Sequence, residues 1–169
     1  MTATLSPTTS LMPLFATVGE AMTAKVVALQ ADTPADVAIR RLEHTQVSGA
    51  PVIDHGRVVG VVTLRDLLAP VLADGSIQTT GPFHRHEHCL ARYRIRELMT
   101  ADPVTIRTGS TLAEAVVAMD QAGVNRVPVV DAAGRPVGIL TRDDVLRVLA
   151  RSIRQLGLPA GGRPQMEPD

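Results

Sequence analysis

Two short stretches of the sequence place a hydroxyl and a carboxylate three residues apart, each where an apolar run gives way to a helical pattern. In "GVVTLRDLL" the pair is Thr63 and Asp66, and in "GILTRDDVL" it is Thr141 and Asp144. Such a pair is typical of a helix N-terminus, where both side chains bond free backbone N–H groups. A carboxylate can also accept both hydroxyls of a sugar diol, and a helix start attracts phosphate. One copy alone favours the cap, but the motif occurs twice.

The two stretches belong to an internal repeat. With a shift of 77 residues, "EAMTA" (20–24) aligns with "ELMTA" (97–101). After Asp54 and Asp131 the shift becomes 78, because "IDHGRVV" has two loop residues where "VDAAGRPV" has three. The extra residue falls in a predicted hairpin turn, where a change of length costs little. The chain therefore contains two copies of one folding unit.

Each copy has the pattern β-α-β-β-α. The first strand is expected over residues 25–30 and 103–108. The next helix is expected to begin at Thr33-Pro34 and at Ser110-Thr111, since proline and hydroxyl residues are helix start signals. A hairpin and a leucine-rich helix complete each unit. The apolar stripes of the first helices predict a core built in part from Val37, Ala38, Ile39, Leu42, Leu112, Ala115, Val116 and Met119.

The composition disfavours several classes of protein. The 169 residues include 17 basic and 17 acidic ones, so no net charge favours nucleic acid or an anionic membrane. The single cysteine, Cys89, leaves no internal disulfide and indicates a reducing compartment. No stretch is long and apolar enough to cross a bilayer, and the start lacks the basic region of a signal peptide. We expect a cytoplasmic protein without membrane insertion.

The chain resembles a tandem pair of cystathionine-β-synthase (CBS) domains, the arrangement called a Bateman module. The resemblance covers residues 18–154 and rests on the two Met-Thr pairs, the two Pro-Val-hydrophobic-Asp strands, Gly60 and Gly138, and the two Thr-x-x-Asp pairs. It implies an α+β fold in which two β-α-β-β-α repeats are related by a pseudo-two-fold axis. Such modules commonly form flat homodimers. The chain then divides into an N-terminal segment (1–17), a first repeat (18–74), a His-rich linker (75–93), a second repeat (94–154) and a disordered tail (155–169).

The resemblance also implies a function. The family's usual role is regulatory, and its members bind adenosine-containing ligands such as AMP, ADP, ATP or S-adenosylmethionine in clefts between the repeats. Carried over to this chain, Asp66 and Asp144 hold ribose, and Thr63 and Thr141 lie beside it. The other expected ligand contacts are the phosphate partners Arg65, Arg126 and Arg142, and the adenine-slot residues Val47, Ala50, Val124 and Val127.

The linker contains a second candidate site. His84, His86 and His88 alternate, so in an extended strand their side chains would face one way, and Cys89 follows directly. Imidazole and thiolate are the preferred ligands of zinc. The spacing matches no recognised zinc-finger pattern, so a polar linker without a specific metal is the alternative.

Three hypotheses therefore remain open. The chain is a nucleotide-binding regulatory module that signals through its shape or its homodimer, a metal-binding or metal-responsive module, or a ligand-free dimerisation scaffold. An unidentified protein partner is also expected. An enzyme is disfavoured, because the sequence has no Gly-rich phosphate loop and no nucleophile motif. Nucleic acid is disfavoured as a partner, because only Tyr93 and Phe83 near the basic linker could stack on bases.

Overall fold

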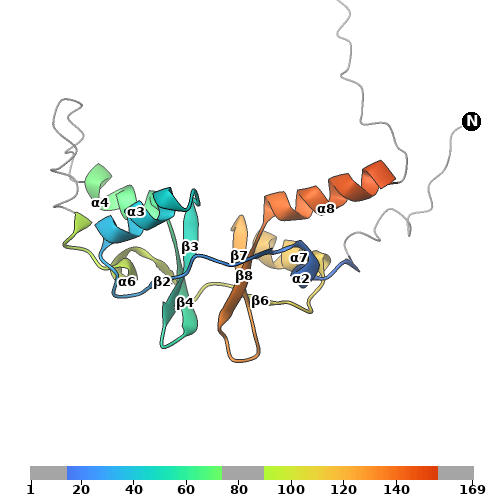
Figure 1. Ribbon diagram of the computed structural model, residues 1–169, viewed down its shortest axis with the longest axis horizontal. Coiled ribbons are helices and arrows are strands. Elements are labelled where there is room, and N and C mark those ends of the chain that lie inside the picture. The colour runs from blue at the N-terminus through green and yellow to red at the C-terminus, as the bar shows by residue number, and fades with distance from the viewer. Residues whose placement is uncertain (1–14, 74–89, 156–169) are drawn as a thin grey trace, which may run out of the picture.

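The computed structural model describes residues 15–73 and 90–155. Two four-stranded sheets lie side by side, and helices pack against each of them (Figure 1). The predicted α+β class with a doubled unit is confirmed. In chain order the elements are α2 (Val18–Ala21), β1 (Thr23–Ala24), β2 (Leu29–Gln30), α3 (Ala35–His44), β3 (Gly49–Asp54), β4 (Arg57–Thr63), α4 (Leu64–Ala73), α6 (Ile95–Leu98), β5 (Thr100–Ala101), β6 (Ile106–Arg107), α7 (Leu112–Gln121), β7 (Arg126–Val130), β8 (Pro136–Thr141) and α8 (Arg142–Gln155).

The two sheets have the same topology. The first has the strand order β2-β3-β4-β5 and the second β6-β7-β8-β1. In each sheet, the crossover helix α3 or α7 joins two parallel strands, and a hairpin then adds an antiparallel one. The strands before the helices are shorter than the predicted ranges 25–30 and 103–108. Lys25 and Asp102, which are equivalent in the repeat, have φ values of +61° and +47° and lie in the breaks that separate β1 from β2 and β5 from β6.

The repeats exchange their first segments. Strand β1 pairs antiparallel with β8 of the second repeat, and β5 pairs antiparallel with β4 of the first. The short helices α2 and α6, which precede these strands, pack with the same repeat as the strands do. Val18 of α2 is buried in the core of the second repeat, and Ile95 of α6 is buried in the core of the first. Each Met-Thr opening therefore completes the sheet of the other repeat.

The helix starts are only partly as predicted. Thr111 caps α7 as expected, since its hydroxyl accepts the N–H of Glu114 at 3.2 Å. Pro34 is not the first helical residue of α3 but its N-cap, and no side chain caps that helix. Instead, the N–H of Ala35 donates to the carbonyl of Tyr93 at 3.0 Å, so a distant segment satisfies this helix end.

The apolar stripes of α3 and α7 are narrower than predicted. Val37 and Val116 are each 40% exposed, whereas Ala38 and Leu42 of α3 are fully buried. The buried residues of α3 recur at helical spacing from Ala35, and Val37 lies beside that stripe on the helix surface. The two valines therefore belong to the solvent-facing side of their helices.

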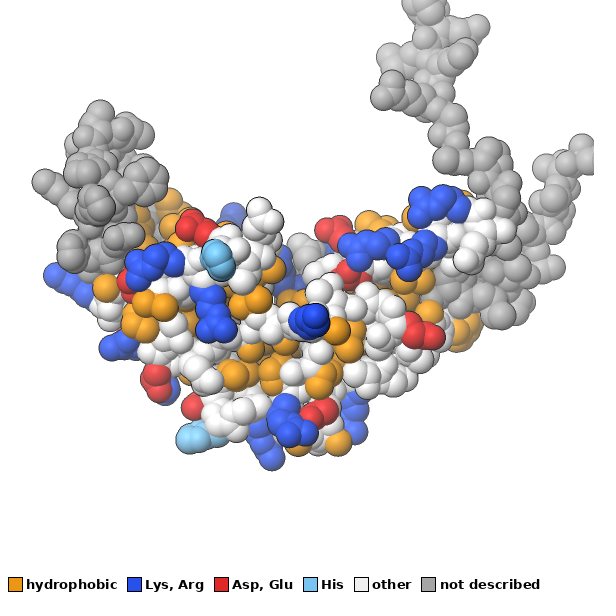
Figure 2. All heavy atoms as spheres, viewed as in Figure 1, with side chains coloured by type: hydrophobic (Ala, Val, Ile, Leu, Met, Phe, Trp, Pro, Cys, Tyr) orange, Lys and Arg blue, Asp and Glu red, His pale blue; other side chains and the backbone are white. Residues whose placement is uncertain are grey.

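The surface has two further features. Figure 2 shows blue side chains along α8, beside a hollow between the repeats. Helix α8 has four exposed arginines, which are Arg142, Arg147, Arg151 and Arg154. Apolar side chains are also exposed on the last helix of each repeat. Leu68 of α4 and Leu146 of α8, which occupy equivalent positions, are 43% and 60% exposed.

Candidate functional site

The Thr63-Asp66 pair forms a helix cap at the joint between β4 and α4. The backbone N–H and the hydroxyl of Thr63 both donate to Oδ2 of Asp66, at 2.8 and 2.7 Å, and the N–H of Asp66 donates to the Thr63 hydroxyl at 3.3 Å. All of these bonds leave Oδ1 of Asp66 unused. Within residues 15–73 and 90–155, no group donates to that oxygen, which remains available to a ligand.

The Thr141-Asp144 pair has the same cap geometry, with distances of 2.8, 2.7 and 3.2 Å. Its surroundings differ. Asp144 is only 3% exposed, and its Oδ1 accepts a hydrogen bond from Nη1 of Arg147 at 2.8 Å. The first repeat has Ala69 at the position of Arg147. Both oxygens of Asp144 are therefore occupied, whereas one oxygen of Asp66 has no partner among the described residues.

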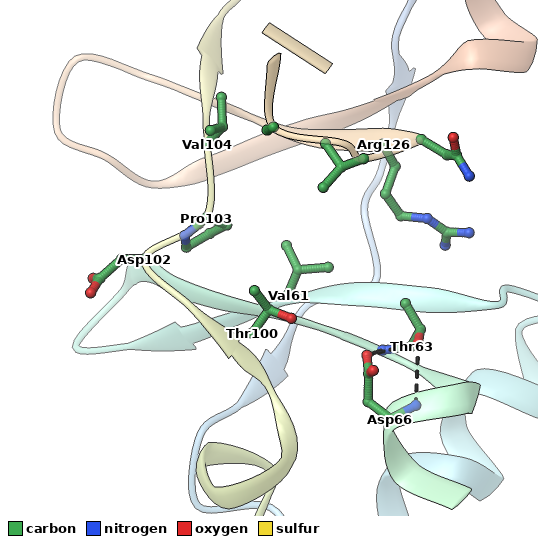
Figure 3. A pocket seen from close by; sticks show the side chains of 11 residues that line it. Val61, Thr63, Asp66, Thr100, Asp102, Pro103, Val104 and Arg126 are labelled. Carbon is green, nitrogen blue, oxygen red and sulfur yellow. Dashed lines mark hydrogen bonds between the residues drawn. The ribbon is translucent and has the colours of Figure 1, made fainter. Parts of the chain in front are cut away.

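The first cleft, of about 440 Å³, lies beside Asp66 and contains residues of both repeats. Val61, Thr63 and Asp66 form one wall, and Val124, Asn125 and Arg126 of the second repeat form the opposite one; a third side is Asp102-Pro103-Val104. Figure 3 shows the Arg126 side chain extending from β7 toward Thr63 and Asp66. A carboxylate, a guanidinium and apolar surface thus face one cavity.

The second cleft, of about 680 Å³, lies beside Asp144 and is the pseudo-symmetric counterpart of the first. Thr141 and Asp144 meet Val47 and Ser48, which correspond to Val124 and Asn125 in the repeat alignment. Both clefts have volumes typical of small-molecule sites. Each combines the Thr-x-x-Asp pair of one repeat with the segment before the Pro-Val strand of the other.

The predicted contact residues are distributed unevenly around the clefts. Val47, Val124 and Arg142 each line one cleft, and Arg126 lines both. Ala50 and Val127 do not line either cleft, because alternate residues of a strand point to opposite faces and these two point into the cores. Arg65 is exposed on α4 and also lies outside both linings.

Arg126 is held between the two clefts. Its Nη2 donates to the hydroxyl of Ser48 at 2.9 Å, across the boundary between the repeats. A Cβ at Gly49 would lie 2.9 Å from its Nη1, so glycine leaves the space that the guanidinium occupies. The equivalent of Arg126 in the first repeat is Gly49 itself. One arginine therefore serves both clefts, and no second copy of it exists.

Sequence reasoning missed several cleft residues. Asp102-Pro103-Val104 enters the first cleft because the exchanged segment passes between the sheets, which no local pattern indicates. Arg147 had a signal, since an arginine three residues after an acid on a helix can form an ion pair. The linker residues His84, His86, His88 and Cys89 lie outside the described residues. Within residues 15–73 and 90–155, no group of three or more His, Cys, Asp or Glu side chains could hold a metal ion.

The repeated unit has counterparts in known proteins. The CBS domain family model matches residues 18–72 and again residues 95–151. This chain belongs to the CBS domain family. The match to two consecutive domains makes it a tandem CBS pair, as the sequence motifs predicted.

Two relatives share most of the length of this CBS pair. It is 31% identical over 140 residues to a CBS domain-containing protein of Dictyostelium discoideum, covering 79% of this chain and 91% of that protein. The crystal structure of CBSX2 of Arabidopsis thaliana in complex with AMP is 33% identical, with a TM-score of 0.63, and the similarity covers 80% of this chain and 96% of that one.

A third similar structure is part of a larger protein. The cytosolic domain of the Mg²⁺ channel MgtE, in complex with ATP, is 30% identical with a TM-score of 0.61. The similarity covers 78% of this CBS pair but 48% of the MgtE chain. In the part of the CBS pair that the structure describes, no helix has the length and apolar character needed to span a membrane.

Proposed function

We propose that this CBS pair is a non-catalytic regulatory module that binds an adenosine-containing ligand in the clefts between its repeats. The observation that carries the proposal is the free Oδ1 of Asp66, placed on the wall of a cleft that also contains Arg126. A carboxylate oxygen already oriented by a helix cap can accept ribose hydroxyls without rearrangement of its own side chain.

The other groups of the first cleft fit the remaining parts of such a ligand. Val61 and Val124 offer apolar surface from opposite repeats for the adenine ring. Arg126 offers a guanidinium for phosphate, which it can bind bidentately. The N–H groups of Leu64 and Asp66 at the start of α4 already donate to Ser48 and Thr63, so the phosphate contact falls mainly to the arginine.

The relatives support the ligand class. The CBSX2 structure contains AMP and the MgtE domain contains ATP. S-adenosylmethionine has the same ribose diol and remains in the proposed set together with ADP. No metal enters the proposal, and the cytoplasm stays the proposed location because a single cysteine leaves no internal disulfide.

Signalling is proposed to occur through a homodimer. Leu68 and Leu146 expose apolar surface at equivalent positions on α4 and α8, so both repeats present matching faces that a second copy could cover. Helix α8 begins at the cleft residue Arg142 and also bears Leu146, which borders the same cleft. A ligand that shifts this helix would therefore change the dimer surface, provided that it binds one arrangement better than the other.

The proposal is tested by calorimetric titration of EDTA-treated protein with AMP, ADP, ATP and S-adenosylmethionine. Saturable binding of at least one of the four is expected. The absence of binding by all four would overturn the proposal and favour the ligand-free scaffold, and metal analysis of untreated protein would then decide on the metal-binding alternative.

A further inference from the structure

The two clefts differ in charge, although the repeat makes their backbones equivalent. The Asp66 cleft is lined by one arginine and two aspartates, which are Arg126, Asp66 and Asp102. The Asp144 cleft is lined by three arginines and two aspartates, namely Arg126, Arg142, Arg147, Asp143 and Asp144. The balance therefore reverses from acidic in the first cleft to basic in the second.

The clefts also differ in whether they can receive a ribose. The Asp66 carboxylate has a free oxygen, whereas both oxygens of Asp144 are used within the protein. The ion pair with Arg147 holds the second oxygen at 2.8 Å. A sugar diol would have to displace this arginine before it reached Asp144, so the second cleft is a poor site for ribose.

Arg147 remains able to bind an anion while it holds Asp144. The pair uses Nη1, and the Arg147 side chain is 57% exposed at the cleft. A guanidinium has five N–H donors in a planar fork, so the remaining donors can bind a phosphate oxygen. Arg142 begins the same helix five residues earlier and is exposed on the same cleft. Two guanidinium groups on one cleft can bind a ligand that has several phosphate groups.

We propose that the Asp144 cleft binds the polyphosphate part of an adenosine di- or triphosphate, and that Arg147 determines this specificity. The inference rests on the proposed function and assigns a different part of the ligand to each cleft. The Asp66 cleft binds the ligand through its ribose, whatever the number of its phosphate groups. The Asp144 cleft selects ligands by their number of phosphate groups. The first cleft does not, because it has Ala69 at the position of Arg147 and so lacks this guanidinium.

Sodium tripolyphosphate is the direct probe, because it has the phosphates without the nucleoside. Calorimetric titration is done with the wild-type chain, Arg147→Ala, Arg147→Lys and Arg151→Ala. Arg151 is the matched control, since it is exposed one turn further along α8 and lies outside the cleft lining. We expect Arg147→Ala to weaken tripolyphosphate binding about tenfold or more, Arg147→Lys to weaken it less, and Arg151→Ala to leave it unchanged.

The number of adenosine sites is a second readout, which would not change if Arg147 only stabilised the fold. Arg147→Ala frees Oδ1 of Asp144, so we expect this variant to gain a second adenosine site while the wild-type protein has one. The proposal is overturned if Arg147→Ala retains wild-type tripolyphosphate affinity, or if Arg147→Ala and Arg151→Ala weaken it equally.

The failure of this inference is distinct from the failure of the proposed function. Adenosine binding without any effect of Arg147→Ala on tripolyphosphate would leave the function and remove the division between clefts. Arg147-dependent tripolyphosphate binding without adenosine binding would keep the phosphate site at Asp144 and overturn the ribose site at Asp66. A chain that binds neither probe would overturn both.

Discussion

The side chain of Met22 lies directly over Gly138, and Met99 lies in the same way over Gly60. Each methionine belongs to the Met-Thr opening of one repeat, and each glycine to the hairpin of the other. A Cβ at either glycine would collide with the methionine sulfur and would lie 3.0 Å from the carbonyl oxygen of Thr23 or 3.1 Å from that of Thr100, so glycine lets the exchanged segment pack closely there. This contact explains why the Met-Thr pair and the glycine recur together in the sequence.

Substitution of this glycine is expected to destabilise the protein. Gly138→Ala should lower the free energy of unfolding by about 1–3 kcal/mol, because the added methyl group overpacks against Met22. Urea denaturation followed by circular dichroism measures the change. Gly109→Ala is the control, since a Cβ at Gly109 meets no atom within 4 Å. Equal losses in the two variants would contradict the packing explanation.

The helix caps provide a second prediction. Thr111→Ala should cost about 1 kcal/mol of stability, because it removes the hydroxyl that accepts the N–H of Glu114. Thr33→Ala should cost much less, since no side chain caps α3 and the carbonyl of Tyr93 receives the N–H of Ala35. Thermal unfolding of both variants measures the difference. A larger loss of stability for Thr33→Ala than for Thr111→Ala would contradict this explanation, because it would show that the Thr33 hydroxyl stabilises the start of α3.

The proposed homodimer gives a third prediction. Leu68→Arg and Leu146→Arg should each shift the protein from dimer to monomer in size-exclusion chromatography with light scattering, because a charge would replace apolar contact at the interface. Ala133→Arg, on an exposed hairpin, is the control with the same added charge. A wild-type monomer, or dimers in both leucine variants, would exclude these helix faces as the interface.

Much of the fold was predictable because its signals are local. The turn at Gly56 and the cap at Thr111 each depend on a few neighbouring residues, and the repeat is visible because the same short motifs occur twice. The exchange of β1 and β5 was not predictable from the sequence, since each of these strands has only two residues and is defined by its pairing with a distant strand. The missed cap of α3 has the same cause, because Tyr93 supplies it from the segment just before the second repeat, far away in the sequence.

The candidate site likewise has features that the sequence predicts and features that it does not. The Thr-x-x-Asp pairs were recognisable because both of their roles arise from residues three apart. Which neighbouring residues face the clefts depends on strand alternation across the pseudo-two-fold axis, and for that reason Val47 and Val124 line them while Ala50 and Val127 do not. The unequal surroundings of Asp66 and Asp144 required the position of Arg147 in space.

The most direct test of the account compares AMP binding by the wild-type chain, Asp66→Asn and Glu114→Gln in one calorimetric series. Glu114 belongs to a similar cap, at the start of α7, but lies outside both clefts. The account predicts that Asp66→Asn weakens AMP binding about tenfold or more, because the carboxylate that accepts the ribose hydroxyls is lost, while Glu114→Gln binds as the wild type does. Unchanged AMP affinity in Asp66→Asn would contradict the account and leave Thr63 and Asp66 as a helix cap alone.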